Sequence, residues 1–223
     1  MRNLSLVVGP LALVACADTN VLTIELAHGS ESEATLAAEL RELMDIYDLS
    51  VWIWTSQILI DEDAVPHSHP VLTLNTQHIG RERLLLSTFI HEQLHWYAEA
   101  HQLAVNEAIP TLREEFPTVP VGYPEGARSE YSTYLHLIVC YLEYSALQDL
   151  LGLSEAADVI RYWTKQHYRW IYRIVLERQE LLAAVAAAHG LLPVFSSNNS
   201  LERTVMVRSS FLTRDRAAAQ LRR

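Results

Sequence analysis

Two histidines four residues apart flank a glutamate in the segment His91-Glu92-Gln93-Leu94-His95. On a helix, residues four apart lie one turn apart on the same face, so both imidazoles can bind one Zn²⁺ ion at about 2.0–2.1 Å. Glu92 is turned about 100° from His91 on such a helix, where it can reach a metal-bound water without binding the metal. The metal lowers the pKa of that water and the glutamate takes its proton, as in HExxH zinc hydrolases. The motif predicts Zn²⁺ as cofactor, His91 and His95 as ligands and Glu92 as general base.

A third ligand is expected from the apolar segment 127–150, whose pattern predicts a second long helix. Three ionisable side chains in this segment are candidates, namely His136, Glu143 and Glu130. Burial of such a group among leucines is costly unless the group is paired or binds a metal. His136 and Glu143 lie two helical turns apart, or about 10 Å, so they cannot easily bind one ion together. We predict His136 as the ligand and Glu143 as an acceptor that orients a zinc-bound imidazole, with Glu143 or Glu130 as alternative third ligands.

The motif and its helical surroundings, residues 87–97, resemble the active-site helix of the zincin metallopeptidases. The resemblance implies an α+β fold in which an edge strand before this helix lines the cleft and pairs with an extended peptide, a role that residues 71–75 could fill. It is closest to the gluzincin branch, which takes its third ligand from a later helix, although that branch prefers a glutamate there. The metzincin continuation is not matched, because Ala98 replaces a glycine and a continued helix turns His101 away. Cys16 also lacks the surroundings of the peptide deformylase cysteine.

The same resemblance implies a tyrosine or histidine that stabilises the oxyanion of the transition state. The chemically suitable side chains are Tyr131, Tyr134, His167 and Tyr172, and sequence spacing does not choose among them. A second metal site is conceivable in residues 66–70, where two histidines lie between two prolines. Such a turn is more typical of a solvated loop.

The elements that must position these groups follow from hydrophobic periodicity and from glycine and proline placement. Strands are expected over residues 21–26, 51–54, 58–60 and 71–75. Helices are expected over residues 33–47, 81–101, 127–150 and 154–189, with residues 110–126 as a link rich in proline and glycine. Strands early and helices late predict an α+β fold.

Composition excludes several classes of function. The 223 residues are 50% hydrophobic, enough for one domain with a sizeable core. With 17 Lys+Arg against 27 Asp+Glu the net charge is −10, so a nucleic-acid partner is not expected. No apolar run reaches the roughly 18–20 residues of a membrane-spanning helix. Two cysteines, Cys16 and Cys140, cannot form a disulfide framework or a four-cysteine zinc site.

The two ends of the chain differ from its middle. Residues 1–20 are interpreted as a possible lipoprotein signal or N-terminal segment, because their apolar run ends in a lipobox-like Leu-Val-Ala sequence before Cys16. An ordinary first strand is the alternative. Residues 194–223 carry six arginines against one glutamate and one aspartate, which is typical of a mobile basic tail. Residues 21–193 are then expected to form the zincin-like metallopeptidase domain. Two locations stay open, namely the cytoplasm, or the cell envelope if a lipidated Cys16 attaches the protein to a membrane.

Together these features favour a zinc-dependent hydrolase, most simply a metallopeptidase that acts on a peptide or protein substrate. One alternative is a zinc amidase for a non-peptide or cell-wall amide. Another is a non-catalytic zinc-bound interaction domain, which would keep the ligands without needing Glu92 as a base.

Overall fold

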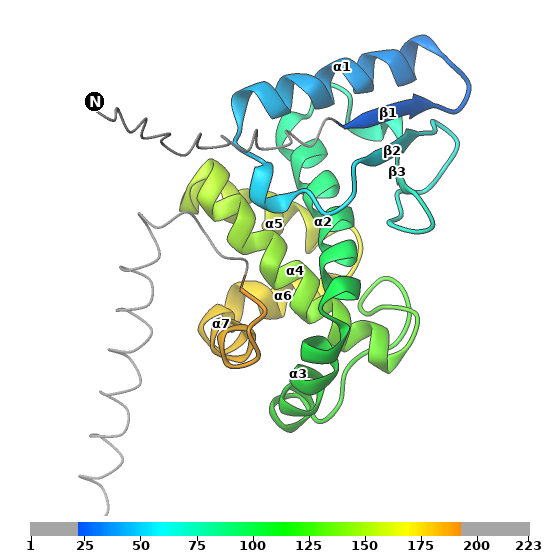
Figure 1. Cartoon of the computed structure of the whole chain (residues 1–223). Coiled ribbons are helices and arrows are strands. Elements are labelled where there is room, and N and C mark those ends of the chain that lie inside the picture. The colour runs from blue at the N-terminus through cyan, green and yellow to red at the C-terminus, as the bar shows by residue number, and fades with distance from the viewer. Residues whose placement is uncertain (1–21, 193–223) are drawn as a thin grey trace, which may run out of the picture.

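A computed structural model of the chain describes residues 22–192. The N-terminal segment with Cys16 and the arginine-rich tail lie outside these residues. The described part is α+β, as the order of strands and helices predicted. Figure 1 shows the small sheet at one end of the molecule, below α1, and the other long helices extending away from it.

The sheet has three short parallel strands in the order β1-β2-β3. These are β1 Thr23–Leu26, β2 Gln57–Ile60 and β3 Leu72–Leu74. Helix α1, Glu31–Ile46, packs against β1 and β2. Strand β3 forms an edge of the sheet and contacts the helix that carries the HExxH motif. The predicted edge strand before that helix is therefore present, although it is only three residues long.

The prediction of a strand over residues 51–54 was wrong. Residues Ser50–Trp52 form a 3₁₀ helix, η1, and a second one, η2, spans Thr76–His78. The N–H groups of Trp54 and Thr55 donate to Oε1 of Gln93, at 2.7 and 2.9 Å, and Nε2 of Gln93 donates to the Thr55 carbonyl at 2.9 Å. These backbone groups are bonded to a side chain of the motif helix, so they do not pair with a strand.

Two long helices at the centre of the molecule confirm the predictions made for them. They are α2, Glu82–Ala100, and α4, Glu130–Leu151, and they pack against each other (Figure 1). Helix α4 also contacts α3, α5, α6 and α7, so it is buried on nearly every side, as its apolar sequence requires. Within residues 22–192, no helix combines the length and the hydrophobicity that a bilayer crossing needs.

Two other helix predictions need correction. Residue Pro110 does not begin the link, because it lies inside α3, Gln102–Glu115. The long helix predicted for residues 154–189 is three shorter helices, α5 Leu153–Trp163, α6 Arg169–Glu177 and α7 Gln179–Ala188. The break before α6 occurs at Tyr168, whose backbone is left-handed with φ 49° and ψ 39°. A helix cannot continue through that conformation.

Candidate metal centre

Three histidines converge where α2 packs against α4. One nitrogen from each of His91, His95 and His136 lies within 4.8 Å of the other two. The ring centroids are 5.1 Å apart for His91–His95, 4.9 Å for His95–His136 and 5.8 Å for His91–His136. The structure therefore brings together the three side chains that the sequence singled out, from two helices that are far apart along the chain.

Hydrogen bonds fix the orientation of two of these rings. Nδ1 of His91 lies 2.9 Å from Oε2 of Glu143, and Nδ1 of His136 lies 2.6 Å from the carbonyl oxygen of Ser132. A carboxylate and a carbonyl only accept, so each Nδ1 carries a proton and donates it. The Nε2 atom of each ring is then the one left to bind a metal.

Glu143 is held by several side chains deep in the protein. It is fully buried, and besides His91 it accepts hydrogen bonds from the hydroxyls of Tyr172, at 2.9 Å, and Ser87. Nε1 of Trp163 donates in turn to Oγ of Ser87 at 2.8 Å. The position of Glu143 is the one expected of a carboxylate that orients a ligating histidine, and it lies outside the three-histidine cluster.

A second group of possible ligands shares His91 and adds Cys140 and Glu143. The donors around Glu143 already satisfy its carboxylate, and burial raises the pKa of the Cys140 thiol, which disfavours the thiolate that binds metals. The three imidazoles are therefore the better site. A third group, His28 with Asp61 and Asp63, is largely solvent-exposed, as such groups commonly are without an ion.

The protonation states of the three histidines suit a metal that prefers imidazole ligands. Burial lowers the pKa of His95 well below its usual value and that of His136 to about 3, so both rings are neutral at pH 7. Burial alone would lower the pKa of His91 too, but hydrogen bonds with Cys140 and Glu143 raise it well above the usual value. A cation at Nε2 of His91 would take the place of that extra proton. Three imidazoles with a buried carboxylate behind one of them form a donor set that fits Zn²⁺.

Glu92 follows His91 directly on α2, and its carboxylate is not engaged by another side chain of the described residues. The residue is 8% exposed, and no hydrogen bond to its side chain is found among residues 22–192. Burial raises its pKa, while His91 and the histidines of the 66–70 loop act against that rise. A buried carboxylate with a raised pKa and no fixed partner is suited to take up and release a proton.

Tyr168 is a member of the site that the sequence did not indicate. Its ring centroid lies 4.3 Å from that of His136 and 6.3 Å from that of His91. It is the one residue other than glycine with a positive φ in the part of the chain that the structure describes, and its hydroxyl has no hydrogen bond there. Backbone strain at a ring that borders the candidate ligands points to function. Nothing in the sequence marks it among the neighbouring aromatic residues.

The tyrosines proposed earlier are engaged elsewhere. Besides Tyr172, which donates to Glu143, the hydroxyl of Tyr134 donates to the carbonyl of Phe116 at 2.6 Å. Tyr131 is exposed and donates to Asn106 at 3.0 Å.

Three histidine and glutamate candidates lie outside the cluster. Glu130, the first residue of α4, lies nearly two turns before His136 and forms an exposed ion pair with Arg113 at 3.2 Å. His101 donates from Nδ1 to the Tyr97 carbonyl at 2.9 Å, away from the cluster as predicted. His167 packs its ring 5.0 Å from that of Tyr168 and belongs to the surroundings of the site.

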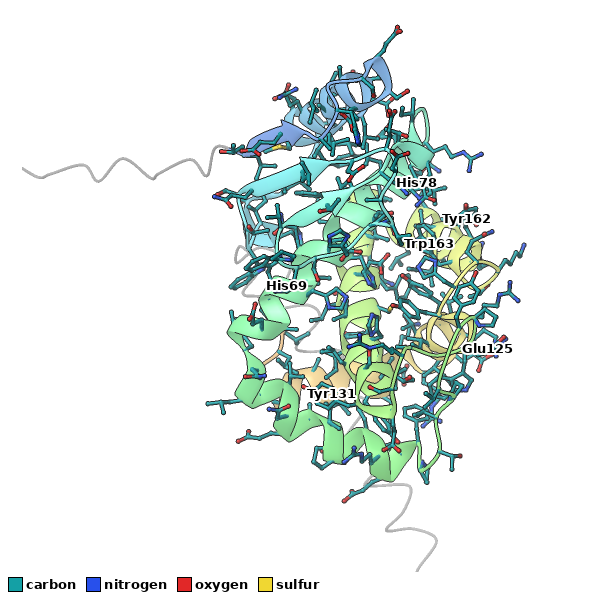
Figure 2. All side chains as sticks on the ribbon, turned by 90° about the vertical axis from the view of Figure 1, so that its right-hand side faces the viewer. His69, His78, Glu125, Tyr131, Tyr162 and Trp163 are labelled. Carbon is teal, nitrogen blue, oxygen red and sulfur yellow. The ribbon has the colours of Figure 1, made fainter. Side chains whose placement is uncertain are left out.

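The two histidines of the 66–70 loop do not form a metal site together. Nδ1 of His67 donates to the Val65 carbonyl at 2.8 Å, whereas Nε2 of His69 lies 2.7 Å from Glu99. Figure 2 shows His69 beside α2 just below the sheet, on the opposite side of this face from Trp163.

Comparisons with known proteins identify no relative: no family model, no curated protein and no solved structure matches the chain. The resemblance to zincins therefore rests on the chain's own residues.

Proposed function

We propose that this protein is a zinc-dependent hydrolase that cleaves peptide bonds. The observation that carries the proposal is the convergence of His91, His95 and His136 beside the unpaired carboxylate of Glu92. Three imidazole ligands that leave a position open for water, with a carboxylate nearby to act as general base, suit hydrolysis by a metal-activated water.

Each side chain has a distinct part in this proposal. His91, His95 and His136 would hold Zn²⁺, which supplies a Lewis acid and lowers the pKa of a water molecule. Glu92 accepts the proton of the attacking water and delivers it to the leaving nitrogen. The Tyr168 hydroxyl donates to the carbonyl oxygen as negative charge develops on it.

The test combines metal analysis with hydrolysis. The purified full-length protein, supplied with zinc, is expected to retain about one ion per chain and to hydrolyse a mixed pool of peptides and simple amides. A chelator should abolish this activity, and Glu92→Gln should lose it while keeping the zinc. The matched control is Glu107→Gln, on the exposed face of α3, which should keep both.

Two results would count against the proposal. Bound zinc without turnover of any amide would favour a non-catalytic interaction domain. A chain that binds no zinc would leave the three imidazoles with a structural role only.

A further inference from the structure

The outer edge of β3, the strand nearest the motif helix, is already paired within the chain. The N–H of Thr73 donates to the carbonyl of His67 at 2.8 Å, and the N–H of His67 donates to the carbonyl of Thr73 at 3.1 Å. The other side of β3 pairs with β2. Thr73 is the middle residue of the strand, so its outward-facing backbone groups are the ones that an added strand would need.

Side chains from α2 and from Asn75, the residue after β3, hold the 66–70 loop in this place. Nε1 of Trp96 donates to the carbonyl of Ser68 at 2.8 Å, and the ring of His69 stacks on Trp96 at 4.2 Å. The side-chain amide of Asn75 donates to the carbonyl of Ala64 at 2.9 Å, just before the loop. Displacement of the loop would break these contacts together with the two bonds to Thr73.

The loop also borders the proposed metal site. Its two histidines are electrostatic neighbours of Glu92, and Trp96 directly follows the ligand His95. Figure 2 shows the ring of His69 between the sheet and the lower part of the molecule, at the side of α2. A substrate bound at the proposed metal site would therefore contact this loop, because the loop covers the outer edge of β3.

An extended polypeptide that binds by strand addition draws its affinity from backbone hydrogen bonds to a free edge. Here Thr73 has no backbone groups left to offer, and a long chain would have to displace the loop first. A short molecule needs no such edge, because the metal, Tyr168 and the loop can hold it around a single amide. We propose, on the basis of the proposed function, that the substrate is a short amide of dipeptide to tripeptide size, not an internal bond of an extended polypeptide.

The test compares two substrate pools with the zinc-loaded full-length protein. One pool contains dipeptides, tripeptides and N-acyl amino acids, whose separate rates distinguish peptide from non-peptide amides. The other contains unfolded polypeptides, and mass spectrometry reports the products of both. We expect kcat/KM for internal bonds of the long chains to be about 100-fold lower than for the short pool, because a long chain must first break the two backbone hydrogen bonds that hold the loop on Thr73. Equal or faster cleavage of the long chains would overturn this inference and leave the proposed function standing, whereas no turnover of either pool by the zinc-bound protein would overturn both.

A pair of variants tests the role of the loop backbone. His67→Pro removes the N–H that donates to Thr73, whereas His67→Ala changes the same side chain and keeps that N–H. Cleavage of long chains should rise about tenfold in the proline variant alone, as expected for one backbone bond removed. A folded, zinc-retaining proline variant that still ignores long chains would overturn the inference. If that variant does not fold, the comparison of the two pools with the wild-type protein decides.

Discussion

Nδ1 of His91 donates a hydrogen bond of 2.9 Å to Oε2 of Glu143, a residue 52 positions later on a different helix. Glu143 is in turn held by Tyr172 and Ser87, so the imidazole has a fixed tautomer and a fixed plane. The geometry of the proposed metal centre is therefore built partly by residues that do not face the metal.

Replacement of Glu143 by glutamine should weaken zinc binding without removing a ligand. The neutral amide can still accept from His91 but no longer supports the basicity of the ring, so we expect the affinity for zinc to fall about 10- to 100-fold. Competition with a chromophoric chelator measures this change. Glu130→Gln, at the exposed start of α4, is the matched control, and an equal loss in both variants would contradict the assigned role.

Replacement of His136 by alanine should abolish stoichiometric zinc binding, because two imidazoles alone leave the ion without a third protein ligand. His101→Ala should keep its zinc, since that ring is bonded to the Tyr97 carbonyl. Elemental analysis of the two purified variants gives the metal-to-protein ratio directly. If zinc persists in the His136 variant and is lost from Glu143→Ala, the third ligand has been assigned to the wrong residue.

The phenol of Tyr168 should matter for the chemical step more than for binding. In Tyr168→Phe the ring beside His136 remains and only the hydroxyl is lost, so kcat should fall about 10²- to 10³-fold with zinc content unchanged. Separate determination of kcat and KM on a short amide substrate shows where the loss occurs. Tyr131→Phe should behave like the wild-type protein, and an equal effect there would refute the specific role of Tyr168.

Acid should remove a stabilising contribution from Glu33, a buried carboxylate in the first turn of α1. Burial raises its pKa, but hydrogen bonds from the ring and N–H of His28 and from the N–H groups of Glu62 and Ser30 outweigh this and lower the pKa to about 2. A carboxylate with a lowered pKa stabilises the folded state fully above its usual pKa of 4.5, and this stability is lost as the pH falls towards 2.

The difference in unfolding free energy between the wild type and Glu33→Gln should therefore be largest at neutral pH. It should shrink steadily below pH 4.5, as urea denaturation at a series of pH values would show. Glu31→Gln, at an exposed position of the same turn, is the control and should change stability little at any pH. A difference for Glu33→Gln that does not vary with pH would rule out this electrostatic account.

The main elements of the fold could be predicted where the local pattern decides the structure. Helices α2 and α4 have long apolar patterns without internal glycine or proline, and both formed as expected. The absence of a strand over residues 51–54 could not be predicted, because the N–H of Trp54 donates to the side chain of Gln93, 39 positions further along the chain. The break at Tyr168 is also tertiary in origin, since the N–H of Arg169 donates to the distant Pro124 carbonyl.

The candidate site was predictable to the extent that burial and spacing constrain chemistry. The HExxH spacing singled out three residues, and the cost of an imidazole within an apolar helix singled out His136. Glu143 accepts a hydrogen bond from His91, as an acceptor that orients a candidate ligand would, and its role toward a metal stays a prediction. Tyr168 could not be chosen, because its distinguishing property is a backbone conformation that the other aromatic residues nearby do not share.

The amide of Gln93, in the middle of the motif, makes three hydrogen bonds to the backbone of residues 54 and 55. A slide or rotation of α2 relative to residues 54 and 55 would break all three hydrogen bonds at once. We therefore expect α2 to keep its position against this segment. Tyr168 directly precedes α6, and no hydrogen bond of its side chain is found within residues 22–192. We therefore expect adjustment to an incoming molecule to move the phenol of Tyr168 more than the imidazoles of α2.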